Sequence, residues 1–246
     1  MIEVGLATHR GHVREQNEDN VLAQYPVYAV ADGMGGHAAG EVASAMAVES
    51  LRSLVGQRLD ALEPVAEAVR VANSRIWDGG RLPGQRGMGT TVAGCVAMTD
   101  GSWAVFNVGD SRVLLIHDGG IRQLTRDHSE VADMVTLGIL APEEAAVHPL
   151  RHIVTRSLGA RAQVDVDADR VEVAPGDRLL VCSDGLTDEV PPDDIFWVMD
   201  TAEDPQSAAD ALVQAALAAG GHDNITVIVI DVESERTAPL SDRRRR

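Results

Sequence analysis

The sequence contains no lysine, so all 21 of its lysine-or-arginine positions are arginines. Set against 38 aspartates and glutamates, they leave a formal net charge of −17. A surface this acidic repels nucleic-acid phosphates, so we expect no nucleic-acid partner. The acidic excess has two interpretations, a solvated surface or a cluster of carboxylates that binds cations. The motifs described below favour the second.

Long apolar segments are also missing. No apolar run approaches the roughly 20 residues that a helix needs to cross a bilayer. Residues 1–5 carry no basic segment followed by an apolar stretch, which a secretory signal would require. We therefore expect a cytoplasmic protein without a membrane segment.

Cysteine is scarce, and both cysteines stand inside apolar runs. Cys95 and Cys182 are expected to be buried structural thiols, because a free cysteine packs like a small hydrophobic residue. Two cysteines in a chain of this size do not imply a disulfide framework. Neither begins the C-x5-R loop of cysteine-dependent phosphatases, because Gly101 and Asp188 stand where the arginine would be.

Short apolar runs separated by turn residues predict a protein rich in β-strands. The expected strands cover residues 2–8, 27–31, 90–98, 102–108, 113–117, 164–173, 178–182 and 225–232. The separators at 99–101, 109–110 and 118–120 contain glycine and aspartate, which is typical of hairpin turns. We therefore expect successive strands to pair with each other in antiparallel sheets.

Helical spacing of alanine, valine and leucine predicts helices at residues 41–54, 64–77, 129–137, 142–148, 193–199 and 205–219. Runs of strands with helices grouped around them indicate an α+β fold with antiparallel sheets, rather than a parallel βαβ sheet. No repeat or linker divides the chain, so we expect one domain over residues 1–233. The tail, residues 234–246, ends in four arginines and is expected to be disordered.

Acidic residues recur where the expected strands meet turns. Asp32, Asp110 and Asp184 follow apolar strands, Asp223 precedes one, and a further acidic pair stands at 18–19. A carboxylate at the end of a core strand is costly to desolvate, and several together repel one another unless cations neutralise them. Ligand sets made of oxygen suit Mg²⁺ or Mn²⁺ rather than zinc. Any one Asp-Gly could be a simple turn, but the shared context favours a cation site.

A different alternative comes from Gly33, Gly35 and Ala38, which fit the loose G-x-G-x-x-G/A dinucleotide pattern between a strand and a helix. Two features count against a nucleotide site. Asp32 would place a carboxylate beside the pyrophosphate, and the helix is followed by another helix rather than by an acidic-ended strand.

Six motifs occur in an order that resembles a known family. They are Arg14-Glu15-Gln16-Asn17-Glu18-Asp19-Asn20, Val30-Ala31-Asp32-Gly33-Met34-Gly35-Gly36-His37, Gly87-Met88-Gly89-Thr90-Thr91, Val108-Gly109-Asp110-Ser111-Arg112, Ser183-Asp184-Gly185-Leu186-Thr187-Asp188 and His222-Asp223-Asn224-Ile225-Thr226. Together they resemble the metal-dependent serine/threonine protein phosphatases of type 2C, in the bacterial form. The resemblance covers about residues 8–231.

This resemblance implies an antiparallel β-sandwich flanked by helical layers, with metal ions at one end. Asp32 would bridge two ions and serve catalysis directly, and the carbonyl of Gly33 would be a further ligand. Asp184 and Asp223 would complete the first ion. The expected cofactors are two Mn²⁺ or Mg²⁺ ions, with a third in bacterial members.

The remaining roles also follow from the resemblance. Glu18 and Asp19 would hold metal-bound waters, and Asp110 with Asp184 would form the third site. Arg14 would grip the substrate phosphate, because its planar guanidinium suits phosphate oxygens.

The implied reaction is hydrolysis of phosphoserine or phosphothreonine by a hydroxide that two ions bridge, with no phosphorylated enzyme intermediate. The substrates would be proteins phosphorylated by a serine/threonine kinase, and a monomer is expected. Animal members carry a histidine where this chain has Met34. We therefore expect metal-bound water to protonate the leaving group, and we expect His37 to have a structural role at a helix start.

The segment 127–159 resembles the flap that borders the active site in bacterial members. It either contacts substrate or packs as ordinary structure, and the sequence does not separate the two interpretations. Two other functions stay open as well. One is an inactive relative that binds phosphoproteins as a regulatory module, and the other is a nucleotide-binding oxidoreductase.

Overall fold

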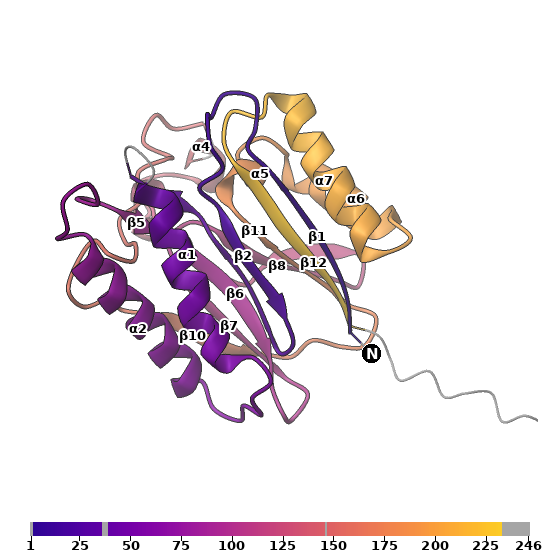
Figure 1. The fold of residues 1–246 in the computed structure, drawn as a ribbon. Helices are drawn as coiled ribbons and strands as arrows, with labels where there is room; N and C mark the ends of the chain where they lie inside the picture. The colour runs from indigo at the N-terminus through magenta and orange to yellow at the C-terminus, as the bar shows by residue number, and fades with distance from the viewer. Residues whose placement is uncertain (1, 36–38, 146, 233–246) are drawn as a thin grey trace, which may run out of the picture.

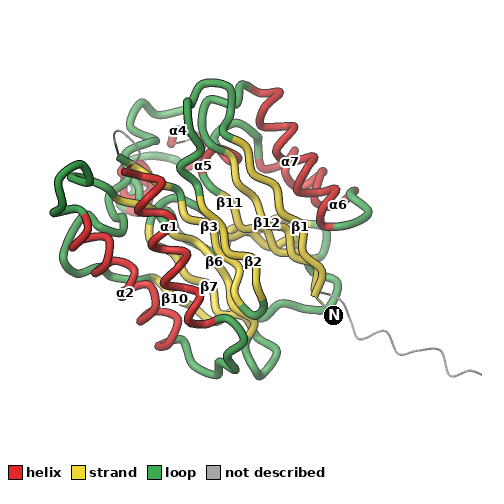
Figure 2. The backbone as a smooth tube through the Cα atoms, viewed as in Figure 1, coloured by secondary structure: helices red, strands yellow, loops and turns green. Residues whose placement is uncertain are grey.

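The computed structural model describes residues 2–35, 39–145 and 147–232. Two five-stranded antiparallel sheets are stacked face to face (Figures 1 and 2). The β12 sheet has the strand order β1 (Ile2–His9), β12 (Ile225–Val232), β11 (Arg178–Cys182), β8 (Arg112–His117) and β9 (Gly120–Gln123). The β3 sheet has the order β10 (Asp167–Val171), β7 (Trp103–Val108), β6 (Val92–Ala97), β3 (Val27–Ala31) and β2 (Asn20–Gln24). The expected α+β sandwich is confirmed.

Helices cover the outer face of each sheet, as Figure 1 shows. The β3 sheet is covered by α1 (Ala39–Leu51), which continues into a 3-10 turn (Arg52–Leu54), and by α2 (Glu63–Gly79). The β12 sheet is covered by α6 (Pro192–Thr201) and α7 (Pro205–Ala219). Shorter elements near one end are α3 (Glu130–Thr136), α4 (Pro142–Ala145), α5 (Asp184–Thr187) and the strand pair β4 (Gly33–Met34) and β5 (Gly89–Thr90).

The core consists of three apolar layers, because the central strands are buried on both faces. In β3, Ala29 faces the α1–α2 layer, while Tyr28 and Val30 face the other sheet. In β12, Val229 faces α7, while Ile228 points between the sheets. Side chains alternate with a period of two along a strand, so a strand covered on both faces reads as a continuous apolar run.

Both cysteines lie in these layers, as the sequence predicted. Cys95 is buried between the sheets, and Cys182 is buried beneath α6 and α7. Both are free thiols, and burial raises the pKa of Cys182 to about 12. Such a thiol stays protonated and inert near neutral pH.

Strand register brings distant parts of the chain to one end of the sandwich. The last residue of β3, Ala31, pairs with the first of β2, Asn20. The last residue of β11, Cys182, pairs with Val227 near the start of β12. The segments just beyond these strand ends, which carry the predicted acidic residues, are therefore neighbours.

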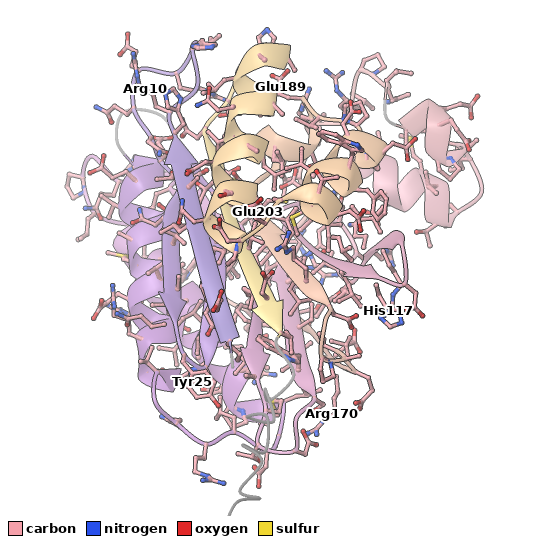
Figure 3. All side chains as sticks on the ribbon, turned by 90° about the vertical axis from the view of Figure 1, so that its right-hand side faces the viewer. Arg10, Tyr25, His117, Arg170, Glu189 and Glu203 are labelled. Atoms are coloured by element: carbon pink, nitrogen blue, oxygen red, sulfur yellow. The ribbon has the colours of Figure 1, made fainter. Side chains whose placement is uncertain are left out.

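The two ends of the described chain meet at the opposite end. Ile2 pairs with Val232 as the outermost partners of β1 and β12. Figure 3 shows this polarity from the side, with Arg10 and Glu189 at one end and Tyr25 at the other. Among the described residues, no helix combines the length and the apolar character that crossing a bilayer requires.

One expected hairpin is wrong. Residues 109–110 were expected to join two paired strands, but β7 belongs to the β3 sheet and β8 to the β12 sheet. The turn carries the chain from one sheet to the other, and Gly109 there has a φ of 122°. The structure also divides the expected strand 90–98 into β5 and β6, and it adds β2, β4, β9 and α5.

The strands predicted at 27–31, 178–182 and 225–232 and the helix at 205–219 are confirmed residue for residue. The helix expected at 142–148 ends at Ala145. His37 and the tail 234–246 lie outside the described residues, so the expectations for them stay predictions.

Candidate metal centre

A cavity of about 1130 Å³ opens at the end of the sandwich where the acidic segments meet. Most of the residues predicted from the sequence line it, namely Arg14, Glu18, Asp32, Gly33, Asp110, Asp184 and Asp223. Asp19 is buried behind them, where its Oδ2 accepts a hydrogen bond of 2.8 Å from Ser183 Oγ. The structure thus brings the predicted set together at one place.

Hydrogen bonds to Thr90 and Thr91 hold the backbone of Asp32. Its N–H donates to Thr91 Oγ1 (3.1 Å), and its carbonyl accepts from Thr90 Oγ1 (2.8 Å) and from the N–H of Thr91 (2.9 Å). The next residue must be glycine, because a Cβ on Gly33 would lie 2.4 Å from the carbonyl oxygen of Gly40. The backbone around Asp32 is therefore fixed on both sides.

Asn224 holds the other half of the site. Its Nδ2 donates to the backbone carbonyls of residues 10 and 16 (3.0 and 2.9 Å), and its Oδ1 accepts from the N–H of Glu18 (2.8 Å). A Cβ on Gly185 would lie 2.0 Å from the carbonyl oxygen of Asn224. This close approach places Asp184, which begins α5, beside Asp223, which precedes β12.

The clustered carboxylic acids are hard to ionise. Burial, with the neighbouring carboxylates adding to it, raises the pKa of Asp32 well above its ordinary value and that of Asp110 to about 8. Burial also raises the pKa of Asp19 to about 7 and that of Asp184 to about 6. Packing so many acids together is costly unless positive charge compensates them.

Unpaired oxygen atoms indicate what would compensate them. Among the described residues, Asp19 Oδ1 and Asp184 Oδ1 are buried without a hydrogen-bond partner. A buried carboxylate oxygen without a partner costs free energy, and a divalent cation would remove that cost. The donors are oxygens, as Mg²⁺ and Mn²⁺ prefer. The residues present therefore fit the metal centre expected from the sequence.

Arg14, which the resemblance assigns to the substrate phosphate, lies at the rim of the cavity. Its Nη2 forms an ion pair of 2.5 Å with Asp223 Oδ2, and 55% of its side chain is exposed. The hydrogen bond to Asp223 is the main reason why the pKa of Arg14 is raised. The guanidinium thus occupies an oxygen of a predicted metal ligand, which the sequence did not indicate.

Two histidines in the cavity were missed by the sequence analysis. His152 Nδ1 lies 2.9 Å from Asp188 Oδ2, and His222 Nδ1 lies 2.7 Å from Glu189 Oε1. Donor atoms of His152, Asp184 and Asp188 lie within 4.8 Å of one another. His222 directly precedes Asp223, and this adjacency was a usable signal. His152 lies outside the six motifs, and its one signal was its place in the segment 127–159, which resembles the flap beside the active site.

Comparison with known proteins agrees with this geometry. The sequence model described as protein phosphatase 2C matches residues 8–219. The chain belongs to the protein phosphatase 2C family. It is 40% identical over 235 residues to the serine/threonine protein phosphatase PstP of Mycobacterium tuberculosis, covering 94% of this chain and 45% of that protein. It therefore spans about half the length of this relative. The serine/threonine phosphatase Stp of Listeria monocytogenes is 36% identical, covering 91% of this chain and 93% of Stp.

Solved structures of the family share the fold. The crystal structure of the M. tuberculosis phosphatase PstP/Ppp has a TM-score of 0.90 at 37% identity, covering 95% of this chain and 99% of that one. The catalytic domain of PstP in complex with two manganese ions has a TM-score of 0.85 at 35% identity, with the same coverage. A phosphatase of Mycobacterium smegmatis, solved with cacodylate, also has a TM-score of 0.85, at 39% identity and with coverage of 94% and 98%.

The fold also removes the nucleotide-site alternative. Gly33 pairs with Thr90 in the antiparallel β4–β5 pair. A dinucleotide site requires a parallel βαβ unit, with the glycine turn between its first strand and its helix. The glycines of this member of the 2C family instead allow the close backbone contacts beside Asp32.

Proposed function

We propose that this chain hydrolyses phosphoserine and phosphothreonine in proteins. One observation carries the proposal. Asp32, Asp110, Asp184 and Asp223 come from four strand ends in two sheets, yet they line one cavity in a chain of the 2C family. Buried carboxylates that raise one another's pKa values destabilise the fold, and such groups cluster at functional sites.

We propose Mn²⁺ or Mg²⁺ as the cofactor, with two ions in adjacent sites and a further ion in a third site. Asp32, the Gly33 carbonyl, Asp184 and Asp223 would hold the first two ions, and Asp110 with Asp184 would hold the third. When bound, these ions lower the pKa of water and offset the charge of the phosphoryl oxygens. The manganese complex of the related PstP domain supports this assignment.

The chain's own groups position the reactants. Without cations the carboxylates would repel a phosphate dianion, and the guanidinium groups that line the cavity, Arg14 and Arg151, can attract it directly. We assign the phosphate contact to Arg14. Arg14 holds Asp223 in the structure, and a phosphate would compete for the same guanidinium. Glu18 and Asp19 would orient waters around the ions. Glu18 lines the cavity, and Asp19 is buried behind it.

Met34 lines the cavity where animal members have histidine, and its thioether carries no proton. We propose that water in the cavity protonates the leaving alkoxide. His152 and His222 also reach the cavity, each with one ring nitrogen held by a carboxylate. These two imidazoles are the protein groups that could protonate the alkoxide instead of water.

We further propose a cytoplasmic monomer that acts on the products of a serine/threonine kinase. Kinases consume ATP, which cells keep on the cytoplasmic side. The predicted metal ligands all come from one chain, so no second subunit is needed to complete the site. Light scattering after gel filtration and fractionation of cells that express the protein would test these two points.

The decisive experiment is hydrolysis of p-nitrophenyl phosphate and of a phosphothreonine peptide, with Mn²⁺ and with EDTA. We expect turnover that requires Mn²⁺, and we expect Asp32→Asn to lose more than 99% of it while melting normally. Asp118→Asn is the matched control, because Asp118 is an exposed carboxylate in the β8–β9 turn. Peptide binding without phosphate release in the wild type would instead identify a regulatory binding module.

A further inference from the structure

A second cavity adjoins the catalytic one. It has a volume of about 710 Å³, and Asp110, Asp184 and Glu189 line both cavities. We call it the flap groove, because one wall is α3 of the flap and the other is the segment 187–192, from the end of α5 to the start of α6. A molecule bound at the metal centre can therefore extend into the flap groove.

Each wall of the flap groove carries apolar side chains. Val131 and Val135 stand one helical turn apart on α3 and line the same side. Val190 and Pro191 line the opposite side. This lining differs from the catalytic cavity, whose walls are dominated by carboxylates.

Most charged groups of the flap groove are already paired. Arg126 pairs with Asp133, Asp188 with His152 and Glu189 with His222. Arg112 donates from Nε and Nη2 to both carboxylate oxygens of Asp127, at 2.6 to 3.1 Å. Gln123 Nε2 donates to the same carboxylate at 2.7 Å. These pairs need no charge from a ligand, and the other charged residues of the lining, Asp110, Arg151 and Asp184, also line the catalytic cavity. Away from that boundary the groove favours an apolar group over an acidic or basic one.

The flap wall is anchored before any ligand arrives. Ser129 caps the N-terminus of α3, and the N–H of Glu130 donates to the carbonyl of Ile153 (2.9 Å). The N–H of Thr155 donates to the carbonyl of His128 (2.8 Å). A preformed groove loses little conformational entropy when it binds a side chain.

We propose that the flap groove binds an apolar side chain next to the phosphorylated residue of the substrate polypeptide. This inference rests on the proposed function and adds a sequence preference to it. A cube of 710 Å³ has an edge of about 9 Å, which is roughly three residues of extended chain. The preferred apolar residue therefore stands two to four positions from the phosphoresidue, on one flank.

The test compares phosphopeptides that carry leucine or aspartate at each position from four before to four after the phosphothreonine. Burying a leucine side chain corresponds to roughly a ten- to hundredfold higher kcat/KM for the leucine peptide at one flanking position. p-Nitrophenyl phosphate is too small to reach the groove, so it reports the metal centre alone. Its hydrolysis separates failure of this inference from failure of the proposed function.

Two substitutions place a carboxylate in opposite walls of the flap groove. Val135→Asp changes α3, and Pro191→Asp changes the N-cap of α6, where aspartate is a favoured residue and folding should be kept. We expect each to lower kcat/KM for the leucine peptide at least tenfold and to remove the preference over aspartate. Hydrolysis of p-nitrophenyl phosphate should stay within about twofold of wild type.

Leu137→Asp is the matched control. Leu137 lies just after α3 in the same flap, but its side chain is 73% exposed and does not line the groove. We expect it to keep the leucine preference. Equal hydrolysis of leucine and aspartate peptides by the wild type would overturn the proposal. So would an equal loss on both substrates in Pro191→Asp, or a change in oligomeric state with unchanged peptide selectivity.

Discussion

Replacing Asp184 by asparagine should stabilise the metal-free protein while abolishing its activity. Asp184 is a proposed ligand, and its Oδ1 is buried without a partner. Burial, with Asp188 and Asp223 adding to it, raises its pKa from 3.8 to about 6. Asparagine has nearly the same shape, carries no charge, and its amide can donate to the neighbouring carboxylate of Asp32.

The magnitude follows from the pKa of Asp184. A rise of about two pKa units corresponds to roughly 3 kcal/mol between the charged and neutral forms. The carboxylates share this cost and the cavity admits water, so we expect about half, or 1–2 kcal/mol. In a chain of this size that is an increase in Tm of about 3–6 °C.

The direction of the pH dependence is fixed by the sign of the shift. The folded-state pKa of Asp184 lies above the unfolded one, so its contribution to stability is complete below about pH 4 and is lost as pH rises through about 6. The variant avoids that loss. Its gain in Tm should therefore be near zero at about pH 4 and complete by about pH 8.

The assay is thermal unfolding in EDTA at both pH values, followed by the same measurement in millimolar Mn²⁺. Manganese should raise the Tm of the wild type more than that of the variant, because only the wild type keeps the full ligand set. Asp118→Asn should change neither result. A variant that melts at or below the wild-type temperature at pH 8 in EDTA would refute the argument that the carboxylates destabilise the empty centre.

Three further predictions concern turnover. Arg14→Ala should lower kcat/KM on phosphopeptides about ten- to hundredfold. The Mn²⁺ affinity measured by calorimetry should be unchanged or higher, because Arg14 competes with the metal for Asp223. A loss of Mn²⁺ affinity would contradict the phosphate-binding role. Asp110→Ala should reduce turnover while calorimetry still shows the first two sites, and loss of all binding would contradict a third site. Activity should fall at acid pH, as protons compete for the carboxylates. The apparent pKa of this fall in activity should shift when Mg²⁺ replaces Mn²⁺, and the fall should be unchanged in His152→Asn. If His152→Asn no longer loses activity at acid pH, the His152 imidazole is the proton donor.

The strands predicted best are those buried on both faces. Val27–Ala31 is a continuous apolar run, and Ile225–Val232 is apolar except for Thr226 and Asp231. Alternate residues of each strand pack into different core layers, so both faces select apolar side chains. The strands missed from the two five-stranded sheets, β2 and β9, are edge strands. Asn20–Gln24 and Gly120–Gln123 have one face or both near solvent, so polar residues interrupt the pattern and leave no apolar run to detect.

The sequence predicted which residues form the site better than it predicted how they contact one another. Strand-end carboxylates such as Asp32 and Asp184 stand out, because burial of a charge has no packing benefit. The turn at Gly109 was misread, since glycine and aspartate serve a crossing between sheets as well as a hairpin. The Arg14–Asp223 pair and the approach of His152 depend on how separate loops fold over the cavity, and local sequence does not encode that.

The pairing of Ile2 with Val232 has a consequence for how this fold can be joined to other polypeptides. Both residues lie about 23 Å from the cavity end of β12, at seven residues of extended rise. A fusion partner, a tether or a membrane anchor attached at either end would leave the cavity and the flap groove facing away from the attachment. The same closeness suits circular permutation, since a short linker could close the old ends without crossing the substrate's path.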